Sequence, residues 1–232
     1  MQIRRVGIRL GLAALAAATG LAGAAGAADP SRQALVPKLQ GAALVEALRA
    51  GGLTVLMRHM ATDAVTPDPQ ELDVAKCETQ RNLSTLGREQ AEGIHAAIEK
   101  LGIRFSRVLS SPFCRCLETG RIALGEVEPL EILAVGDELT FAEKHERGQA
   151  VRKLLATAPA AGTNVALITH TGTLLYSFGL ETRPEGVAHV FRPGPANTAV
   201  YLGALAPEDW PRFAAELAGG AAAPGGAPPA KP

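Results

Sequence analysis

The sequence has no excess of charge of either sign, because 23 lysines and arginines balance 23 aspartates and glutamates over 232 residues. A chain with zero formal net charge has no global electrostatic field that would draw it toward nucleic acid or an anionic membrane. We therefore expect neither as a partner. The balance still allows a local cluster of basic side chains that binds a small anion.

Cysteine is also scarce, with only Cys77, Cys114 and Cys116 in the chain. A zinc site needs more soft ligands near one another than three scattered thiols supply, so no metal site is expected. A disulfide between Cys77 and either of the other two would leave one free thiol, and three free thiols are the alternative. A nucleophilic cysteine is disfavoured because nothing in the sequence places a base beside it.

Internal repeats are absent, and 47% of the residues are hydrophobic. A chain of this length can form one well-buried domain but not two large ones. We expect a single domain over residues 29–218. Residues 219–232 consist almost entirely of glycine, alanine and proline, cannot bury apolar surface, and are predicted to form a disordered tail.

The longest apolar run lies at the N-terminus. Residues 1–28 begin with arginines at positions 4, 5 and 9, continue with alanine and leucine, and end in Ala25-Gly26-Ala27. This order is typical of a secretory signal peptide with a cleavage site. The run is short and rich in glycine and alanine, which disfavours an uncleaved membrane anchor. We therefore expect a periplasmic or secreted protein that is not stably inserted in a membrane after cleavage.

Apolar strand-like segments alternate with amphipathic helical segments along the rest of the chain. This alternation predicts a three-layer α/β/α sandwich with a mostly parallel central sheet. The expected strands are 53–58, 107–111, 130–135, 164–170, 187–192 and 197–202, and the expected helices are 41–50, 84–101, a segment from 112, 143–156 and a short segment after 170.

The ends of several helices can also be predicted. Ser84 is expected to cap one helix that stops at Gly102, and Ser111 to cap another with Pro112 in its first turn. Gly87, inside the first of these helices, is expected to be a close-packing position, and so is Gly93. Residues 61–81 show no period and predict a long surface loop of the kind that is usually functional.

Polar residues follow three of the buried strands. Arg58 and His59 end the first, Ser111 ends the second with Arg115 in the helix after it, and His170 ends the third. Because ligands of open α/β sheets bind outside the carboxyl ends of strands, we expect these side chains to share one pocket. Guanidinium forks and a helix N-terminus suit phosphate, and a neutral imidazole is a nucleophile near neutral pH. The pattern therefore predicts phosphoryl transfer.

Four segments, in this order, resemble the motifs of the histidine phosphatase superfamily, also called the phosphoglycerate mutase-like family: LMRHMATD, RNLSTLGREQAEGI, VLSSPFCRCLETG and LITHTGTL. The resemblance spans about residues 53–202. The matching positions are Arg58 and His59; Leu83, Ser84, Gly87, Gln90 and Ala91; Ser110, Ser111, Pro112, Arg115 and Thr119; and Thr169 and His170. Each motif alone is weak, but all four in order at suitable spacing are specific.

The resemblance implies a phosphoglycerate mutase-like fold, with residues 29–218 as the histidine phosphatase domain. It implies hydrolysis of a small phosphorylated substrate through a phosphohistidine, without metal or cofactor, because cationic side chains take the metal's role. His59 is the implied nucleophile. The implied phosphate-binding residues are Arg58, Thr62, Arg115 and His170.

A general acid is also implied, as a glutamate in the middle of the chain. The segment ELTFAE offers Glu138, with Glu143 and Asp63 as alternatives. A catalytic acid needs reach to the leaving group and a raised pKa. Met60 and Thr171 stand where the family commonly has glycine, and both are expected to narrow the mouth of the pocket.

Two other functions stay open at this point, a phosphomutase and a phosphate-ligand binding protein on the same fold. The expected export and the lack of a Trp-Glu-Gly segment disfavour a mutase. The complete set of two arginines and two histidines disfavours a protein without turnover. The sequence indicates neither the natural substrate nor the oligomeric state.

Overall fold

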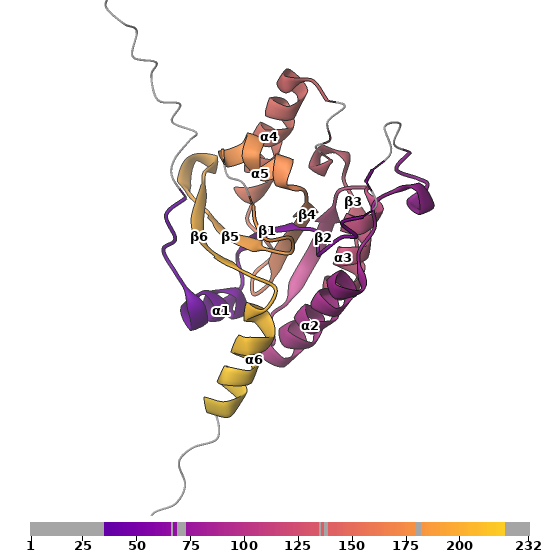
Figure 1. The fold of residues 1–232 in the computed structure, drawn as a ribbon. Helices are drawn as coiled ribbons and strands as arrows, with labels where there is room; N and C mark the ends of the chain where they lie inside the picture. The colour runs from indigo at the N-terminus through magenta and orange to yellow at the C-terminus, as the bar shows by residue number, and fades with distance from the viewer. Residues whose placement is uncertain are drawn as a thin grey trace, which may run out of the picture. The chain divides into compact units, whose positions relative to one another are not determined.

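The computed structural model describes residues 35–65, 67–68, 73–134, 136, 139–179 and 182–220. The expected signal segment and residues 221–232 of the expected tail lie outside this part of the chain. A six-stranded sheet forms the centre of the described part, in the strand order β3-β2-β4-β1-β5-β6 (Figure 1).

The pairing of the strands makes the sheet mostly parallel, as predicted. β1 pairs with β4, β4 with β2 and β2 with β3 in parallel, whereas β5 runs antiparallel to both β1 and β6. The carboxyl ends of β1, β2 and β4 therefore meet at one edge. The strands are β1 (Thr54–Arg58), β2 (Phe105–Ser110), β3 (Glu128–Pro129), β4 (Asn164–Thr169), β5 (Ala188–Pro193) and β6 (Ala199–Leu205).

Helices cover both faces of the sheet, which confirms the three-layer prediction. Successive residues of a buried strand point to opposite faces. In β1, Val55 and Met57 join the apolar cluster under α1, α2, α3 and α6, while Leu56 joins the cluster under α4 and α5. The helices are α1 (Gly41–Ala50), α2 (Thr85–Leu101), α3 (Cys114–Leu124), α4 (Phe141–Leu155), α5 (Thr171–Phe178) and α6 (Asp209–Gly220).

The caps of α2 are as predicted, but the start of α3 is not. Ser84 Oγ accepts a hydrogen bond from the main-chain N–H of Gly87 at 3.1 Å, and Gly102 ends α2 in the left-handed conformation. α3 begins at Cys114 rather than at residue 112, because Ser111, just after the end of β2, is still held by the sheet and donates its N–H to the carbonyl of Ile168.

Two further predictions fail at the edges of the fold. No strand covers residues 130–134; β3 is shorter and earlier, and a 3₁₀ turn (Glu131–Leu133) buries Leu133 against the α4 face. α6 has no counterpart among the predicted helices, although it buries Trp210 and Phe213. It runs through residues 219 and 220, which the sequence placed in the tail.

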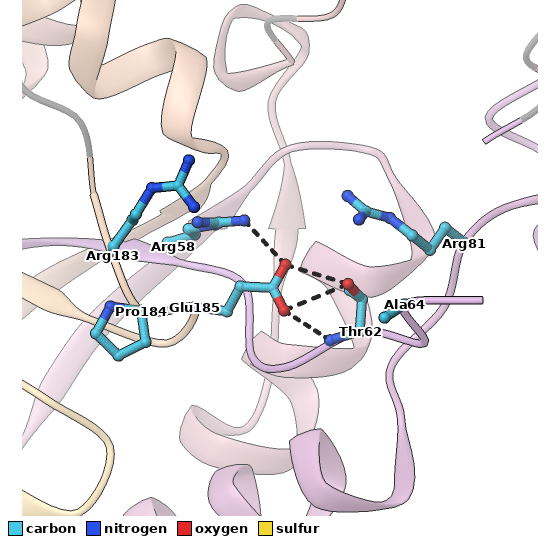
Figure 2. A pocket seen from close by; sticks show the side chains of 7 residues that line it. All are labelled: Arg58, Thr62, Ala64, Arg81, Arg183, Pro184 and Glu185. Carbon is cyan, nitrogen blue, oxygen red and sulfur yellow. Dashed lines mark hydrogen bonds and ion pairs between the residues drawn. The ribbon is translucent and has the colours of Figure 1, made fainter. Parts of the chain in front are cut away.

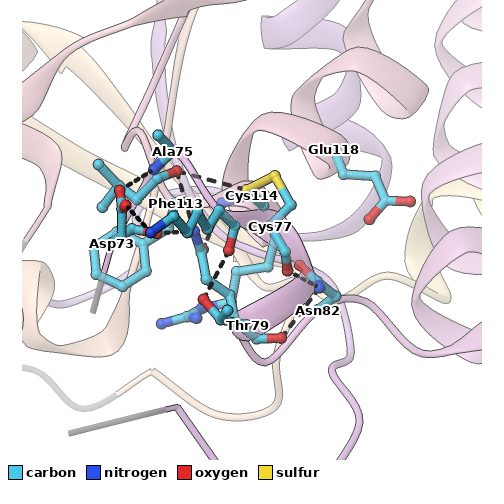
Figure 3. Close-up of a disulfide and its surroundings, with 12 residues drawn as sticks. Asp73, Ala75, Cys77, Thr79, Asn82, Phe113, Cys114 and Glu118 are labelled. Atoms are coloured by element: carbon cyan, nitrogen blue, oxygen red, sulfur yellow. Dashed lines mark hydrogen bonds and ion pairs between the residues drawn. A yellow bond between two sulfur atoms is a disulfide. The ribbon is translucent and has the colours of Figure 1, made fainter. Parts of the chain in front are cut away.

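A disulfide joins Cys77 to Cys114 with their Cα atoms 5.6 Å apart (Figure 3). Cys116 is a buried free thiol. This is one of the two pairings that the sequence allowed. The bond fastens the segment 73–81 to the first turn of α3. Within the described residues, no helix is both long and apolar enough to cross a membrane.

Candidate functional site

The end of β1 places His59 at the carboxyl edge of the sheet, with 2% of its surface exposed. Its main-chain N–H donates to the carbonyl of Thr169 at 3.0 Å, which joins the ends of β1 and β4. In the ring, Nδ1 lies 2.9 Å from the carbonyl oxygen of Met60. A carbonyl only accepts hydrogen bonds, so Nδ1 carries the proton and Nε2 keeps its lone pair.

The surroundings of His59 keep its ring neutral. Burial, the largest cause, lowers the pKa of His59 to about 3, and the positive charges of Arg115 and Arg58 act in the same direction. The hydrogen bond to Met60 opposes them. At neutral pH the imidazole is therefore uncharged and nucleophilic.

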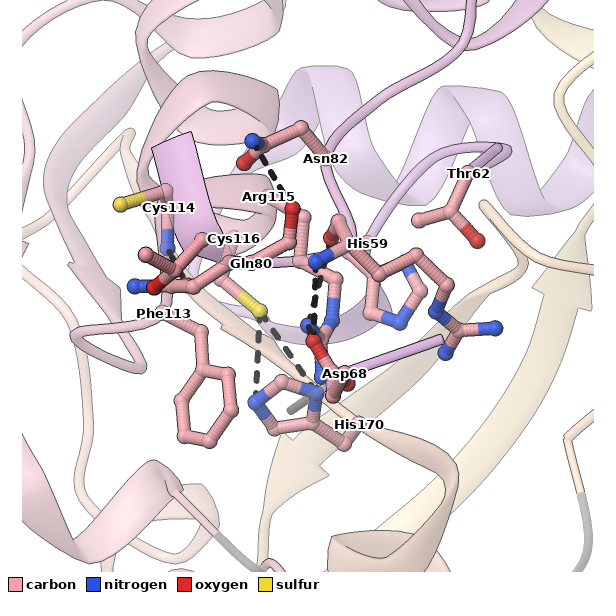
Figure 4. A network of polar contacts seen from close by, with 12 residues as sticks. His59, Thr62, Asp68, Gln80, Asn82, Phe113, Cys114, Arg115, Cys116 and His170 are labelled. Carbon is pink, nitrogen blue, oxygen red and sulfur yellow. Dashed lines mark hydrogen bonds and ion pairs between the residues drawn. The ribbon is translucent and has the colours of Figure 1, made fainter. Parts of the chain in front are cut away.

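His170 follows β4 and lies beside His59, with ring centroids 5.5 Å apart (Figure 4). Its Nε2 lies 2.9 Å from Ser111 Oγ and 3.5 Å from Cys116 Sγ, and the Phe113 ring packs against it edge-on. Burial lowers the pKa of His170, and the neighbouring histidine and arginines add to that shift. Two strands that are distant in the sequence thus place two neutral imidazoles together.

Arg115, in the first turn of α3, is buried next to these rings. Its Nη1 donates to Asp68 Oδ1 at 2.9 Å and to the main-chain oxygen of Arg81 at 3.3 Å. The guanidinium also packs over the ring of Phe113, 4.7 Å from its centroid. Asp68 Oδ1 accepts in addition from the N–H of Arg81 at 3.0 Å. The long loop after β1 therefore reaches into the site.

Arg58 and Thr62 converge on one carboxylate, that of Glu185 (Figure 2). Arg58 Nη2 donates to it at 2.9 Å, and Thr62 donates from its N–H at 2.9 Å and from Oγ1 at 3.1 Å. Glu185 Oε1 also lies 3.9 Å from Nδ1 of His59. Donors that meet at one carboxylate form a ready-made anion site.

A cavity of about 590 Å³ opens beside Arg58. Burial is the largest cause of a lowered pKa at Arg58; the charges of Arg81 and Arg183 also lower it, and Glu185 opposes them. The polar residues that line the cavity are Arg58, Thr62, Arg81, Arg183 and Glu185.

The sequence-predicted residues Arg58, His59, Thr62, Arg115 and His170 all lie at this edge of the sheet. Four charged residues at the site were missed: Asp68, Arg81, Arg183 and Glu185. All four lie in loops without periodicity, where patterns of strands and helices give no information. Arg81 alone could have been recognised from the sequence, because it is the first residue of RNLSTLGREQAEGI, one of the four segments that resemble the family's motifs.

The structure describes two of the three candidates for the general acid, Glu143 and Asp63. Glu138 lies outside the described residues. Glu143 forms the capping box of α4, where its carboxylate accepts from the N–H of Thr140 at 2.8 Å and from its hydroxyl at 2.6 Å. These hydrogen bonds lower the pKa of Glu143, the opposite of what an acid catalyst needs. Asp63 is exposed beyond Thr62.

Met60 does not narrow the mouth, contrary to prediction. Its side chain is fully buried in the core, next to Gly186, so it points away from the cavity. Thr171 exchanges hydrogen bonds with the main chain of Thr182, at 3.0 Å and 3.3 Å, and so fixes the loop that carries Glu185.

Among the described side chains, no group of three or more His, Cys, Asp or Glu could hold a metal ion.

Residues 54–139 match the model of the histidine phosphatase superfamily (branch 1). No curated protein sequence matches the chain. The protein histidine phosphatase SixA, solved with tungstate, is 18% identical with a TM-score of 0.48, covering 68% of this chain and 98% of its own. Phosphoserine phosphatase from Entamoeba histolytica is 15% identical with a TM-score of 0.48, covering 68% and 98%. Alpha-ribazole phosphatase from Shigella flexneri is 18% identical with a TM-score of 0.48, covering 64% and 94%.

Proposed function

Because the chain belongs to the histidine phosphatase superfamily, we propose that it hydrolyses phosphomonoesters through a phosphohistidine formed on Nε2 of His59. One observation carries this proposal. The hydrogen bond from Nδ1 of His59 to the carbonyl of Met60 directs the lone pair to Nε2, in a ring that burial keeps neutral. A buried, uncharged imidazole of fixed tautomer beside a second imidazole is suited to attack on phosphorus.

The phosphoryl group would be held by Arg58, Thr62, Arg115 and His170. Glu185 pairs with Arg58 and Asp68 pairs with Arg115, so each guanidinium already uses some of its N–H donors. Each guanidinium has five N–H donors, and the Nε atoms of Arg58 and Arg115 are buried without a hydrogen-bond partner in the described part of the chain. Both arginines thus have donors to offer to phosphoryl oxygens while the carboxylates stay in place.

The reaction has two steps. In the first, Nε2 of His59 attacks phosphorus, the ester P–O bond breaks, and the leaving oxygen takes a proton from a carboxyl group, for which we propose Glu138. In the second, a water molecule gives a proton to that carboxylate and attacks phosphorus, and the P–N bond breaks to release phosphate. The arginines stabilise the charge on the phosphoryl oxygens in both steps.

The proposal is tested with p-nitrophenyl phosphate in the presence of EDTA. We expect turnover by the wild-type protein and a loss of about 1,000-fold or more in kcat for His59→Ala. His95→Ala is the matched control, because His95 is half exposed on α2 and pairs only with Glu99 among the described residues. We expect it to keep wild-type turnover.

A direct trap of the intermediate makes the test sharper. Substrate labelled with ³²P, quenched in alkali, should leave label on the wild-type protein, because phosphohistidine survives alkali and is lost in acid. Turnover that needs a divalent metal, or that survives His59→Ala, would refute the proposal. Vanadate binding without any turnover would instead favour a phosphate-binding protein.

We also propose that residues 1–28 direct export, and that the histidine phosphatase domain of a periplasmic or secreted protein begins at residue 29 and extends beyond the expected boundary at 218 to the end of α6 at Gly220. The Cys77–Cys114 disulfide supports this location, because such bonds persist in oxidising compartments and are rare in the cytosol.

A further inference from the structure

We propose that the cavity beside Arg58 is a second anion subsite, so that the substrate is a phosphomonoester whose leaving group carries another phosphate or a carboxylate. This inference rests on the proposed function. It concerns the part of the substrate that is not transferred.

The lining of the cavity is strongly basic, although the whole chain is neutral. Among the described residues, Arg58, Arg81 and Arg183 line it, together with one acidic residue, Glu185. Arg81 extends into the space from one side, opposite Arg58 and Arg183 (Figure 2). A concave surface with an excess of one charge concentrates ligands of the opposite charge.

Arg81 has no charge partner among the residues that the structure describes. Its main chain serves the loop, since its N–H donates to Asp68 and its carbonyl accepts from Arg115. Its side chain has no hydrogen bond or ion pair with any described residue, and its Nε is buried without a partner. In contrast, Arg58 pairs with Glu185 and Arg115 with Asp68. A half-buried guanidinium without a counter-charge is the expected state of a ligand-binding arginine.

The electrostatics of Arg58 point the same way. The charges of Arg81 and Arg183 lower the pKa of the Arg58 guanidinium, so the three arginines are close enough to repel one another. Like charges held together at a cavity cost free energy that a bound anion offsets.

The cavity is distinct from the phosphoryl site but continuous with it. Its lining does not include His59, Arg115 or His170, yet it shares Arg58 and Thr62 with the phosphoryl site. Its volume of about 590 Å³ is typical of a site for a whole small molecule. A phosphoryl group alone would fill only a small part of it. A leaving group that extends from the phosphorus past Arg58 would reach Arg81 and Arg183.

The test compares charged substrates with neutral ones of the same shape. The 2-, 3- and 4-carboxyphenyl phosphates are matched with their carbamoyl counterparts, and propane-1,3-diol bisphosphate with the monophosphate. We expect kcat/KM to be roughly 10-fold or more higher for at least one charged member, the effect of one charge-assisted hydrogen bond. The pair that shows the preference identifies carboxylate or phosphate as the second group.

Substitutions then assign the preference to the cavity. In Arg81→Gln and in Arg183→Gln, the ratio of kcat/KM between charged and neutral members should fall to within about 2-fold of unity. Arg104→Gln is the matched control, because Arg104 contacts Gly162 and takes no part in the site. It should keep the wild-type ratio. High salt should reduce the wild-type preference as well, because it screens exposed charges.

Two failures can be told apart. Hydrolysis of phenyl phosphate with equal kcat/KM for every charged and neutral pair overturns the subsite and leaves the proposed function standing. A preference that Arg81→Gln and Arg183→Gln both retain also overturns it. If no phosphomonoester is hydrolysed, the proposed function fails and the subsite fails with it.

Discussion

At the residue scale, two features of His59 control different properties of one ring. The Met60 carbonyl fixes which nitrogen carries the proton, and burial decides whether the ring is charged at all. Both follow from position, since the residue after a buried strand is itself buried when another strand end and a helix cover it. The burial that keeps the ring neutral and nucleophilic therefore also lowers the stability of the folded state in acid.

The lowered pKa of His59 predicts how the free energy of unfolding depends on pH. The folded protein keeps His59 neutral down to about pH 3, whereas the ring takes up a proton near pH 6.5 when the chain unfolds. The unfolded state therefore binds more protons between these values, and the free energy of unfolding falls as pH falls through this range. At pH 5 His59 alone should cost about 2 kcal/mol relative to pH 8.

Urea unfolding of wild type and His59→Asn at pH 8 and pH 5 measures this contribution. Burial also lowers the pKa of His170 and His189, so the variant should still lose stability in acid, but by about 2 kcal/mol less than wild type. Equal losses in the two proteins would show that His59 titrates normally in the folded state.

At the scale of elements, the sequence predicts the site where it lies on regular structure. Apolar runs that end in Arg58 and His170 mark buried strands whose carboxyl ends meet, and β1 and β4 are in fact neighbours. Asp68, Arg81 and Glu185 could not be found in this way, because their positions depend on loops that tertiary contacts arrange. For the same reason the prediction of residues 130–135 as a strand failed: the apolar pattern reports burial of Leu133, but a turn can bury it equally well.

The two glycines of α2 give a prediction at this scale. Both were expected to be close-packing positions, and this is confirmed for Gly87 and wrong for Gly93. A Cβ on Gly87 would lie 2.0 Å from the main-chain oxygen of Ala61, whereas a Cβ on Gly93 would meet nothing within 4 Å. That oxygen accepts from the N–H and the hydroxyl of Ser84, so it cannot move freely.

Gly87→Ala should therefore lower the free energy of unfolding by about 2 kcal/mol and reduce turnover, because the displaced segment begins two residues after His59. Gly93→Ala, the control on the same helix, should gain about 0.5–1 kcal/mol, since alanine favours helices over glycine. Urea denaturation of both variants decides the matter. Similar effects of the two substitutions would contradict the close packing of α2 on Ala61.

At the scale of the whole molecule, a chain with zero formal net charge places four arginines, Arg58, Arg81, Arg115 and Arg183, at one edge of the sheet. The arginines come from β1, α3 and two loops. Among the described residues between β1 and α2, the one helical element is the 3₁₀ turn Cys77–Thr79. The Cys77–Cys114 disulfide holds this loop against α3, and Gln80 adds a hydrogen bond to the N–H of Cys114 at 3.0 Å. The geometry of the site thus depends on a covalent bond outside it.

Loss of this bond should weaken both fold and site. The two cysteines are 37 residues apart, and closing such a loop is worth about 4 kcal/mol in the chain-entropy model. Dithiothreitol should therefore lower the free energy of unfolding by an amount of this order and reduce turnover, because Asp68 and Arg81 lose their anchor. Wild-type protein and a Cys77→Ala/Cys114→Ala double variant, each with and without reductant, are compared by urea unfolding and by phosphatase assay.

The double variant is the control, because it should match reduced wild type and be insensitive to reductant. Protein recovered from the periplasm should begin near residue 29 by mass spectrometry and contain one free thiol under denaturing conditions, which belongs to Cys116. Three free thiols in such protein, or reductant that affects the double variant as strongly as wild type, would remove the disulfide from the mechanism. The bond matters for function because the loop it holds carries a guanidinium and a carboxylate that the sheet alone does not position.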